Sequence, residues 1–149
     1  MEIKYTLPDG TGTTVAVLDS GVSGHGDLAA TDIPLAIDMT AASDPLDHYG
    51  HGSHIAGIIA GQGTNTADAR HRGIAPGASL ISVKVLDGKG QGLTSDVLAG
   101  LDWVYTNRTT YGIDILNLSL GHLIFEPAAD DPLVQAVEQL WNSGVVVIC

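Results

Sequence analysis

An aspartate and a histidine, Asp19 and His51, have the side chains and the local settings that acid–base chemistry requires. Asp19 follows the apolar run Thr14–Leu18, and His51 opens the small-residue sequence His-Gly-Ser-His-Ile-Ala-Gly. A carboxylate at the tip of a buried strand can hold an imidazole in one tautomer and stabilise its protonated form, so that the imidazole acts as a general base. The pair therefore supplies two of the three members of a Ser-His-Asp triad.

Both residues also have simpler interpretations. Asp-Ser-Gly after a strand is a common turn, in which the aspartate accepts hydrogen bonds from nearby backbone amides. His48, His51 and His54 recur at every third position, with Asp44 and Asp47 close in sequence, so a metal site is an alternative. Histidines on one helix bind metal in the H-E-x-x-H pattern, and that glutamate is absent here. The metal alternative therefore rests on a spacing that the known motif does not share.

Apolar runs alternate with helical patterns along the chain and predict the elements that position these residues. Strands are expected at 13–18, 79–86, 114–118 and 145–148, and helices at 50–60, from Thr94 or Ser95 to about 106, and between Asp131 and Gly144. Asp131 before Pro132 predicts an N-cap with proline at the first helical position. This order predicts an α/β fold, a parallel β-sheet with helices on both faces, with strand 145–148 buried on both sides. Sites in such sheets form at the carboxyl ends of strands, where Asp19 and Ser119 lie.

Composition and charge argue against several classes of function. The 149 residues carry a formal net charge of -11, which argues against nucleic acid or an anionic membrane as a partner. No apolar run reaches the roughly 18 residues of a transmembrane helix. A single cysteine excludes a disulfide within the chain. The start, Met1–Thr6, lacks the basic-then-apolar order of a signal peptide.

The two motifs belong to a longer series that resembles the subtilisin-like serine proteases, the subtilase family (peptidase S8). Val15–Val22 is similar to the family's aspartate motif. His51–Gly57 is similar to its histidine motif, with Ser and Ile where Thr and Val are commoner. Gly73–Ala78 resembles the turn before the next strand, and Ile115–Gly121 resembles the substrate-binding strand. The motifs stand in the family's order, and the resemblance runs from about residue 10 to residue 149.

The resemblance implies a serine-type endopeptidase that hydrolyses peptide bonds through an acyl-enzyme. Asp19 would orient His51, and His51 would be the general base. An extended peptide or protein substrate would pair between one wall of the S1 pocket and a facing strand. The residues implied are Ser119, Leu120 and Gly121 on the wall and Gly90, Gln91 and Gly92 on the facing strand. Without the family context, 88–92 describes a flexible loop equally well.

The resemblance implies no cofactor that catalysis requires, but it does suggest calcium. Many members bind calcium through an aspartate that matches Asp27. The Gly61–Arg72 loop, which would supply other oxygen ligands, does not follow the usual pattern. Asp27 therefore enters as a candidate calcium ligand without a predicted partner set.

The family pattern also identifies what the sequence does not contain. It needs an asparagine soon after strand 145–148 to donate to the oxyanion, and a Gly-Thr-Ser nucleophile motif further on. Neither occurs in the 149 residues. We therefore expect residues 1–149 to be part of one subtilase peptidase domain, truncated at Cys149, inactive alone and needing a C-terminal half as partner.

Two other functions stay open for this sequence. One is a noncatalytic remnant that binds peptides through the same two segments. The other is a metal-binding domain that uses His48, His51 and His54. For the full-length parent of an enzyme fragment, the resemblance implies secretion.

Overall fold

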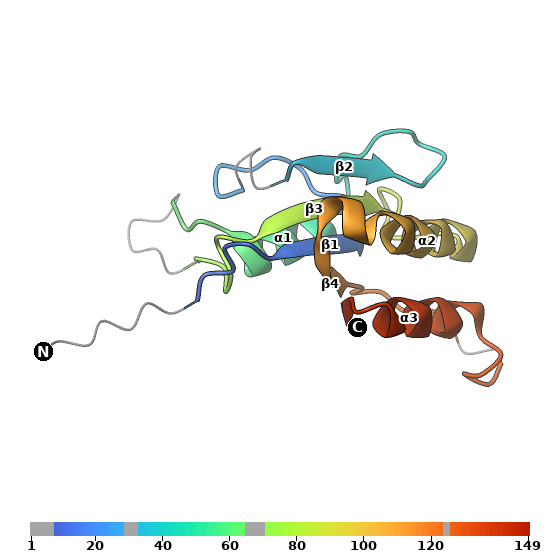
Figure 1. Ribbon diagram of the computed structural model, residues 1–149. Coiled ribbons are helices and arrows are strands. Elements are labelled where there is room, and N and C mark those ends of the chain that lie inside the picture. The colour runs from blue at the N-terminus through green and yellow to red at the C-terminus, as the bar shows by residue number, and fades with distance from the viewer. Residues whose placement is uncertain (1–7, 29–32, 65–70, 124–125) are drawn as a thin grey trace, which may run out of the picture.

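The centre of the molecule is a parallel β-sheet with helices on both faces, as the sequence predicts. The computed structural model describes residues 8–28, 33–64, 71–123 and 126–149 (Figure 1). The sheet has five strands in the order β2-β3-β1-β4-β5, and all neighbouring pairs are parallel. The strands are β1 (Thr14–Asp19), β2 (Leu35–Asp38), β3 (Ser79–Lys84), β4 (Ile113–Asn117) and β5 (Val146–Ile148).

The helices divide between the two faces of the sheet. They are α1 (His51–Ala60), α2 (Thr94–Tyr111) and α3 (Pro132–Asn142). Ala56 and Ala60 of α1 pack in one hydrophobic cluster, whereas Leu101 of α2 and Leu140 of α3 pack in the other. None of the helices in the described part of the chain is long and apolar enough to cross a bilayer.

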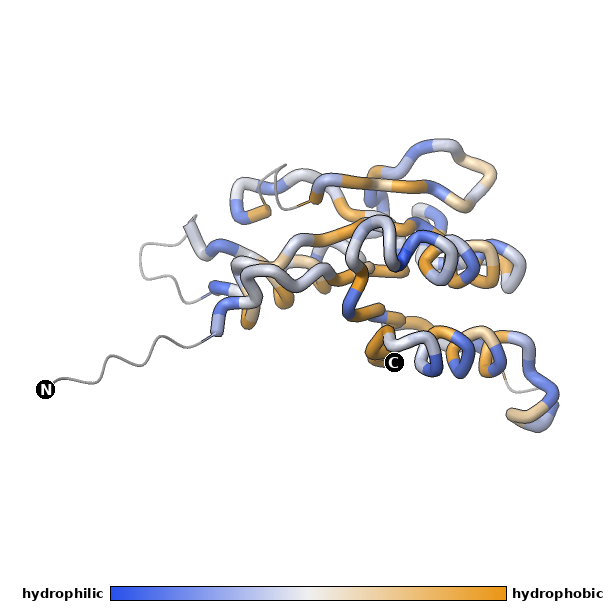
Figure 2. Tube along the Cα trace, in the orientation of Figure 1, coloured by the Kyte–Doolittle hydropathy of each residue, from blue (hydrophilic) through white to orange (hydrophobic). Residues whose placement is uncertain are grey.

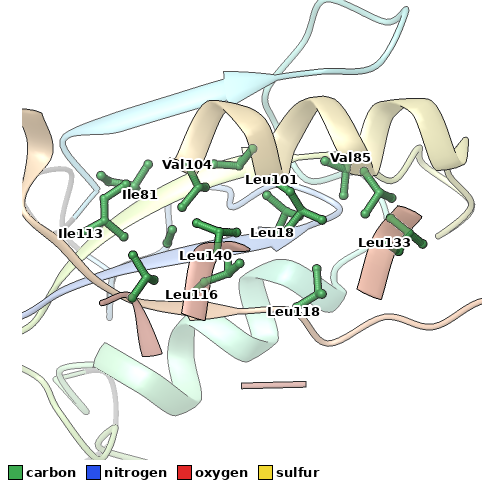
Figure 3. Packing of buried hydrophobic residues seen from close by; sticks show 14 residues of the cluster. Leu18, Ile81, Val85, Leu101, Val104, Ile113, Leu116, Leu118, Leu133 and Leu140 are labelled. Atoms are coloured by element: carbon green, nitrogen blue, oxygen red, sulfur yellow. The ribbon is translucent and has the colours of Figure 1, made fainter. Parts of the chain in front are cut away.

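The central strand β1 shows why this sequence forms a doubly covered sheet. Successive side chains of a strand point to opposite faces. Val15 and Val17 therefore pack on the α1 side, and Ala16 and Leu18 pack beneath α2 and α3. Figure 2 shows hydrophobic residues along the central strands, and Figure 3 shows Leu18 among the side chains of the larger cluster. A strand buried on both faces reads as a continuous apolar run, which is what residues 15–18 are.

The expected elements differ from the observed ones in three places. The edge strand β2 was not expected, because it has four residues and no long apolar run. Helix α2 continues to Tyr111, where Gly112 ends it in the left-handed conformation, and its N-cap is Leu93 without a side-chain bond. Strand β5 is not buried on both sides, since Val146 is 43% and Ile148 is 53% exposed. It is an edge strand of the described sheet.

The capping of α3 follows the sequence prediction. The side chain of Asp131 accepts a hydrogen bond from the Leu133 amide at 2.8 Å, and Pro132 occupies the first helical position. Ser143 is the C-cap, and Gly144 follows it in the left-handed conformation at φ 96°. A proline at the start and a glycine just beyond the end are the usual boundaries of a helix.

The topology directs attention to the carboxyl end of β1. After β1 the chain forms β2 and β3 on one side, then crosses to β4 and β5 on the other. Sheets of this type bind ligands where the strand order reverses, outside the carboxyl ends of the strands. Asp19 is the last residue of β1.

Candidate functional site

Asp19 and His51 meet at the carboxyl end of β1. The Nδ1 atom of His51 lies 2.9 Å from both carboxylate oxygens of Asp19. The Asp19 side chain is fully buried, whereas the His51 side chain is 40% exposed. One ring nitrogen is therefore held by a buried acceptor, and the exposed part of the ring can meet a reactant.

Backbone hydrogen bonds fix Asp19 in place. Its Oδ1 atom accepts a hydrogen bond from the Ser20 amide at 2.7 Å. Its carbonyl oxygen accepts from the amides of Val85 and Leu86, at 2.8 and 3.2 Å, just beyond β3. The backbone of Asp19 is therefore fixed between the ends of β1 and β3, and the Ser20 amide holds the carboxylate in its orientation toward His51.

Gly52 explains how helix α1 comes so near to β1. A Cβ atom at this position would lie 2.1 Å from the carbonyl oxygen of Gly21. The glycine beside His51 is thus required by the close approach of the chain's own backbone at Gly21. Helix α1 can approach the exit of β1 only because no side chain stands between them.

A groove of about 1010 Å³ opens beside His51. The six residues predicted to bind substrate all line it: Gly90, Gln91, Gly92, Ser119, Leu120 and Gly121. Neither segment is a β-strand, because β4 ends at Asn117 and 90–92 lies outside every strand. The description of these segments as strands was wrong, but both do face one cavity.

Hydrogen bonds within the loop give 87–92 its shape. The Oδ1 atom of Asp87 accepts from the amides of Lys89 and Gln91, at 2.8 and 3.0 Å. The bonds from the Gln91 and Lys89 amides hold the pKa of the Asp87 carboxyl below its ordinary value. At Gly90 the φ angle is 73° and a Cβ atom would meet the Tyr49 ring at 2.6 Å. This wall of the groove is therefore a built turn rather than a free loop.

Comparison with known proteins identifies the family of this arrangement. The model of the subtilase family matches residues 10–149. The chain belongs to the subtilase family. Serine protease AprX of Bacillus subtilis strain 168 is 40% identical over 143 residues, covering 93% of this chain and 32% of that protein. Subtilisin DY of Bacillus licheniformis is 34% identical over 140 residues, covering 93% of this chain and 46% of that protein.

A solved structure supports the same assignment. The crystal structure of a cold adapted subtilisin-like serine proteinase matches with a TM-score of 0.75 at 31% identity. The match covers 94% of this chain and 46% of that one. This subtilase chain therefore spans less than half the length of the relatives it matches.

Asp47 is a residue of the site that the sequence analysis considered only as a neighbour of the histidines. Its Oδ1 atom accepts from the Gly50 and Tyr49 amides and from the Ser20 hydroxyl, and its Oδ2 atom accepts from the Ser53 amide and hydroxyl. Burial opposes ionisation of this carboxyl, but the hydrogen bonds from Gly50 and Ser53 outweigh it and hold its pKa below the ordinary value. An aspartate four residues before the histidine was the available signal.

Lys84 is a second residue that sequence reasoning missed. It is 1% exposed, and its Nζ atom donates to the carbonyl oxygens of Asp44 and Leu46 at 2.8 and 2.6 Å. In the register of the two parallel strands, Lys84 of β3 lies opposite Asp19 of β1. A lysine between Val83 and Val85 in a buried strand was the signal, because buried lysines are rare unless paired.

His122 is a third. Its Nε2 atom lies 3.1 Å from Oδ2 of Asp131, the N-cap of α3, and the residue lines the groove directly after Gly121. The pair ties the predicted S1 wall to a helix end. Nothing in the sequence motif indicated it, because the two residues meet only through the fold.

The described residues offer no ligand set for a metal. No group of three or more His, Cys, Asp and Glu side chains among them could hold an ion. His48 bonds to Asp44 at 2.8 Å, His51 bonds to Asp19, and His54 is exposed. The three histidines of the metal-binding alternative therefore do not converge within the described residues.

Asp27, the candidate calcium ligand, is hydrogen-bonded to a neighbouring loop. The Oδ1 atom of Asp27 accepts a hydrogen bond from the Thr64 hydroxyl at 2.9 Å. Part of the Gly61–Arg72 loop, residues 65–70, lies outside the described residues. The role of Asp27 as a calcium ligand therefore stays a prediction.

Proposed function

We propose that this chain contributes the acid–base half and the substrate groove of a serine endopeptidase. The observation that carries the proposal is the Asp19–His51 pair, with Nδ1 of His51 at 2.9 Å from a fully buried carboxylate. The groove beside the exposed part of the ring gives a substrate a place to lie. Membership of the subtilase family supports the reaction class.

The pair defines the roles of the two residues in peptide hydrolysis. Asp19 accepts a hydrogen bond from Nδ1–H of His51, which leaves Nε2 free to take the proton of a serine hydroxyl as that oxygen attacks the peptide carbonyl. His51 then gives this proton to the leaving amine, and the acyl-enzyme forms. Water then attacks the acyl-enzyme with the same help from His51, and the carboxylic acid product is released. Asp19 stays ionised throughout and stabilises the imidazolium.

The nucleophile belongs to sequence other than these residues. Within the part of the chain that the structure describes, no serine hydroxyl bonds to the His51 ring. The 149 residues contain no Gly-Thr-Ser motif. We therefore propose that the chain by itself does not hydrolyse peptides and that a further segment supplies the serine and the oxyanion donor.

Extended peptides or proteins are the proposed substrates. Gly90, Gln91 and Gly92 on one side and Ser119, Leu120 and Gly121 on the other would pair with the substrate backbone. Because both segments line one groove in the described residues, peptide binding without catalysis is the second candidate function. We propose that hydrolysis by the parent protein requires no cofactor and that the parent protein is secreted, as the family suggests.

A fusion separates the two candidates. Residues 1–149 are joined to the part of AprX that follows its aligned region, and hydrolysis of a peptide p-nitroanilide is measured. The chain alone should show no hydrolysis and no stoichiometric labelling by a fluorophosphonate. The fusion should be active, and its His51→Ala variant should lose at least about 10⁴-fold in kcat. A folded but inactive fusion that still binds peptide supports the noncatalytic function instead.

A further inference from the structure

The N-terminus of helix α1 lacks the side-chain cap that would normally hold it. Its N-cap is Gly50, which has φ 96° and makes no side-chain hydrogen bond to the helix. The first amides of a helix have no partners within the helix and must find them elsewhere. His51 is the first residue of α1, so the way in which these amides are satisfied determines where its side chain lies.

Two side chains from outside the helix satisfy these amides. The Ser53 amide donates to Oδ2 of Asp47 at 2.8 Å, and the Gly52 amide donates to the Ser20 hydroxyl at 3.0 Å. The same Ser20 hydroxyl donates to Oδ1 of Asp47 at 2.9 Å. A negative charge next to a helix N-terminus also interacts favourably with the helix dipole.

This network connects the two members of the acid–base pair by a second route. Ser20 directly follows Asp19, and Gly52 directly follows His51. Ser20 and Gly52 are bonded to each other, and Asp47 bonds to Ser20 on one oxygen and to Ser53 on the other. Any movement of α1 relative to the end of β1 must break bonds to the Asp47 carboxylate.

The segment that carries Asp47 is itself fixed. The Asp47 amide donates to the Ser23 hydroxyl at 2.9 Å, and that hydroxyl donates to the Asp47 carbonyl oxygen at 3.1 Å. Lys84 of β3 holds the carbonyl oxygen of Leu46, the preceding residue. The carboxylate is therefore a fixed point against which the helix end is set.

We propose that Asp47 is a positioning residue, whose carboxylate sets the N-terminus of α1 against the exit of β1 and so holds His51 in hydrogen-bonding reach of Asp19. This role rests on the proposed function only because that function makes Asp19 and His51 the acid–base pair. It assigns no contact between Asp47 and a substrate. Its consequence is that the strength of the Asp19–His51 bond depends on a side chain that touches neither reacting atom.

The test follows the bond itself and needs no peptidase activity. NMR of the isotope-labelled chain records the His51 Nδ1 proton and its exchange with water, with Asp19→Asn defining loss of the bond. In Asp47→Ala and Asp47→Asn this proton should exchange at least about tenfold faster, which is the effect of one lost charge-assisted hydrogen bond on the opening equilibrium. Ser53→Ala, which removes one of the donors to Asp47, should give a smaller change in the same direction.

Asp114→Asn is the matched control. It replaces a carboxylate of β4 that accepts a hydrogen bond from the Thr14 amide at 3.0 Å, at the opposite end of β1 from Asp19, and should leave the His51 proton unchanged. Backbone amide spectra report whether each variant is folded. If both Asp47 variants unfold, Ser53→Ala and Ser20→Ala decide by the same signal.

The outcomes distinguish this proposal from the proposed function. Unchanged exchange in folded Asp47 variants overturns the positioning role and leaves the acid–base pair standing. An equal acceleration in Asp114→Asn also overturns it, because the effect would then be a general loosening of the fold. A parent chain without an Asp19-dependent signal overturns both, since there would be no pair to position.

Discussion

At the scale of single residues, the site depends on ionisable groups that are buried and hydrogen-bonded. Asp19 is buried against His51, and Lys84, its neighbour on β3, is buried against two loop carbonyl oxygens. Burying an isolated charge costs several kcal/mol, and hydrogen bonds of good geometry offset that cost. Buried groups of this kind fix the positions of the segments that they bond to, and they add little to the free energy of unfolding.

Lys84 gives a test of that distinction. Lys84→Met removes the buried charge together with its two hydrogen bonds and keeps most of the side-chain volume. The free energy of unfolding should change by less than about 1.5 kcal/mol, because the lost bonds and the lost desolvation penalty nearly cancel. Amide exchange in residues 44–50 should accelerate, since the Asp44 and Leu46 carbonyl oxygens lose their donor.

Denaturant unfolding and hydrogen exchange on the same samples measure the two effects. Lys84→Ala is the companion variant, because it also leaves a cavity. It should lower the free energy of unfolding by about 2 kcal/mol more than Lys84→Met does. Equal losses for Met and Ala would contradict the argument. So would unchanged exchange in residues 44–50 of the methionine variant.

At the scale of elements, sequence patterns predicted what long apolar runs and local motifs specify. Strands β1, β3, β4 and β5 lie within about two residues of their expected positions, because each is an apolar run in a parallel sheet. β2 was missed, since a four-residue edge strand has too short a pattern. Asp19 and His51 could be named because their motifs are local. The roles of Asp47 and Lys84 could not, because they arise only when the segment 44–50 folds back over β1 and β3.

The close approach of α1 to β1 yields a prediction for Gly52. Gly52→Ala places a methyl group 2.1 Å from the Gly21 carbonyl oxygen in the present geometry, and both groups are backbone-anchored. Helix α1 must move outward, which should destabilise the fold by about 1–3 kcal/mol and weaken the Asp19–His51 bond. Denaturant unfolding and the His51 Nδ1 proton signal report the two effects.

The same helix contains a matched control. Gly57→Ala adds the same methyl group where no atom beyond its own stretch of helix lies within 4 Å. It should stabilise the chain by about 0.5–1 kcal/mol, because alanine has the higher helix propensity. Equal effects of the two substitutions would mean that helix propensity, and not the contact with Gly21, determines the result.

At the scale of the whole molecule, apolar surface collects at the β5 edge of the described sheet. Val146 and Ile148 are largely exposed, as is Trp141 of α3, which lines a cavity with Val147. Exposed edge strands pair with other chains. The isolated chain should therefore self-associate, and Ile148→Lys should reduce this association, because a lysine on an edge strand opposes pairing. Sedimentation equilibrium measures it.

Thr109→Lys is the control for that experiment. It adds the same charge at an exposed position on α2, away from the strand edge. Its association should match that of the parent chain. A comparable reduction by both lysines would point to net charge, which is -11 in this sequence, instead of the strand edge.

The acidity of the chain also sets how its stability responds to pH. Hydrogen bonds to the carboxyls lower the pKa values of Asp9, Asp44 and Asp87: from the Thr11 amide to Asp9, from His48 to Asp44 and from the Gln91 amide to Asp87. At Asp47, burial raises the pKa. Hydrogen bonds from Gly50 and Ser53 lower the pKa by more than burial raises it, so it lies below the ordinary value. A carboxyl whose pKa is lower in the folded state stabilises the fold above its unfolded pKa, and this contribution is lost as pH falls through the folded pKa.

Asp47 should dominate that response, because the other three carboxyls are exposed and screened by solvent. The free energy of unfolding should hold its Asp47 contribution at pH 5–7 and lose it below the ordinary carboxyl pKa of about 3.9. The difference between the parent chain and Asp47→Asn should therefore be largest at pH 6 and shrink towards pH 3. Gly57→Ala changes stability without changing a titratable group, so its effect should be the same at both pH values. A pH-independent effect of Asp47→Asn would mean that the carboxylate's charge does not hold the end of α1, and that its shape alone does.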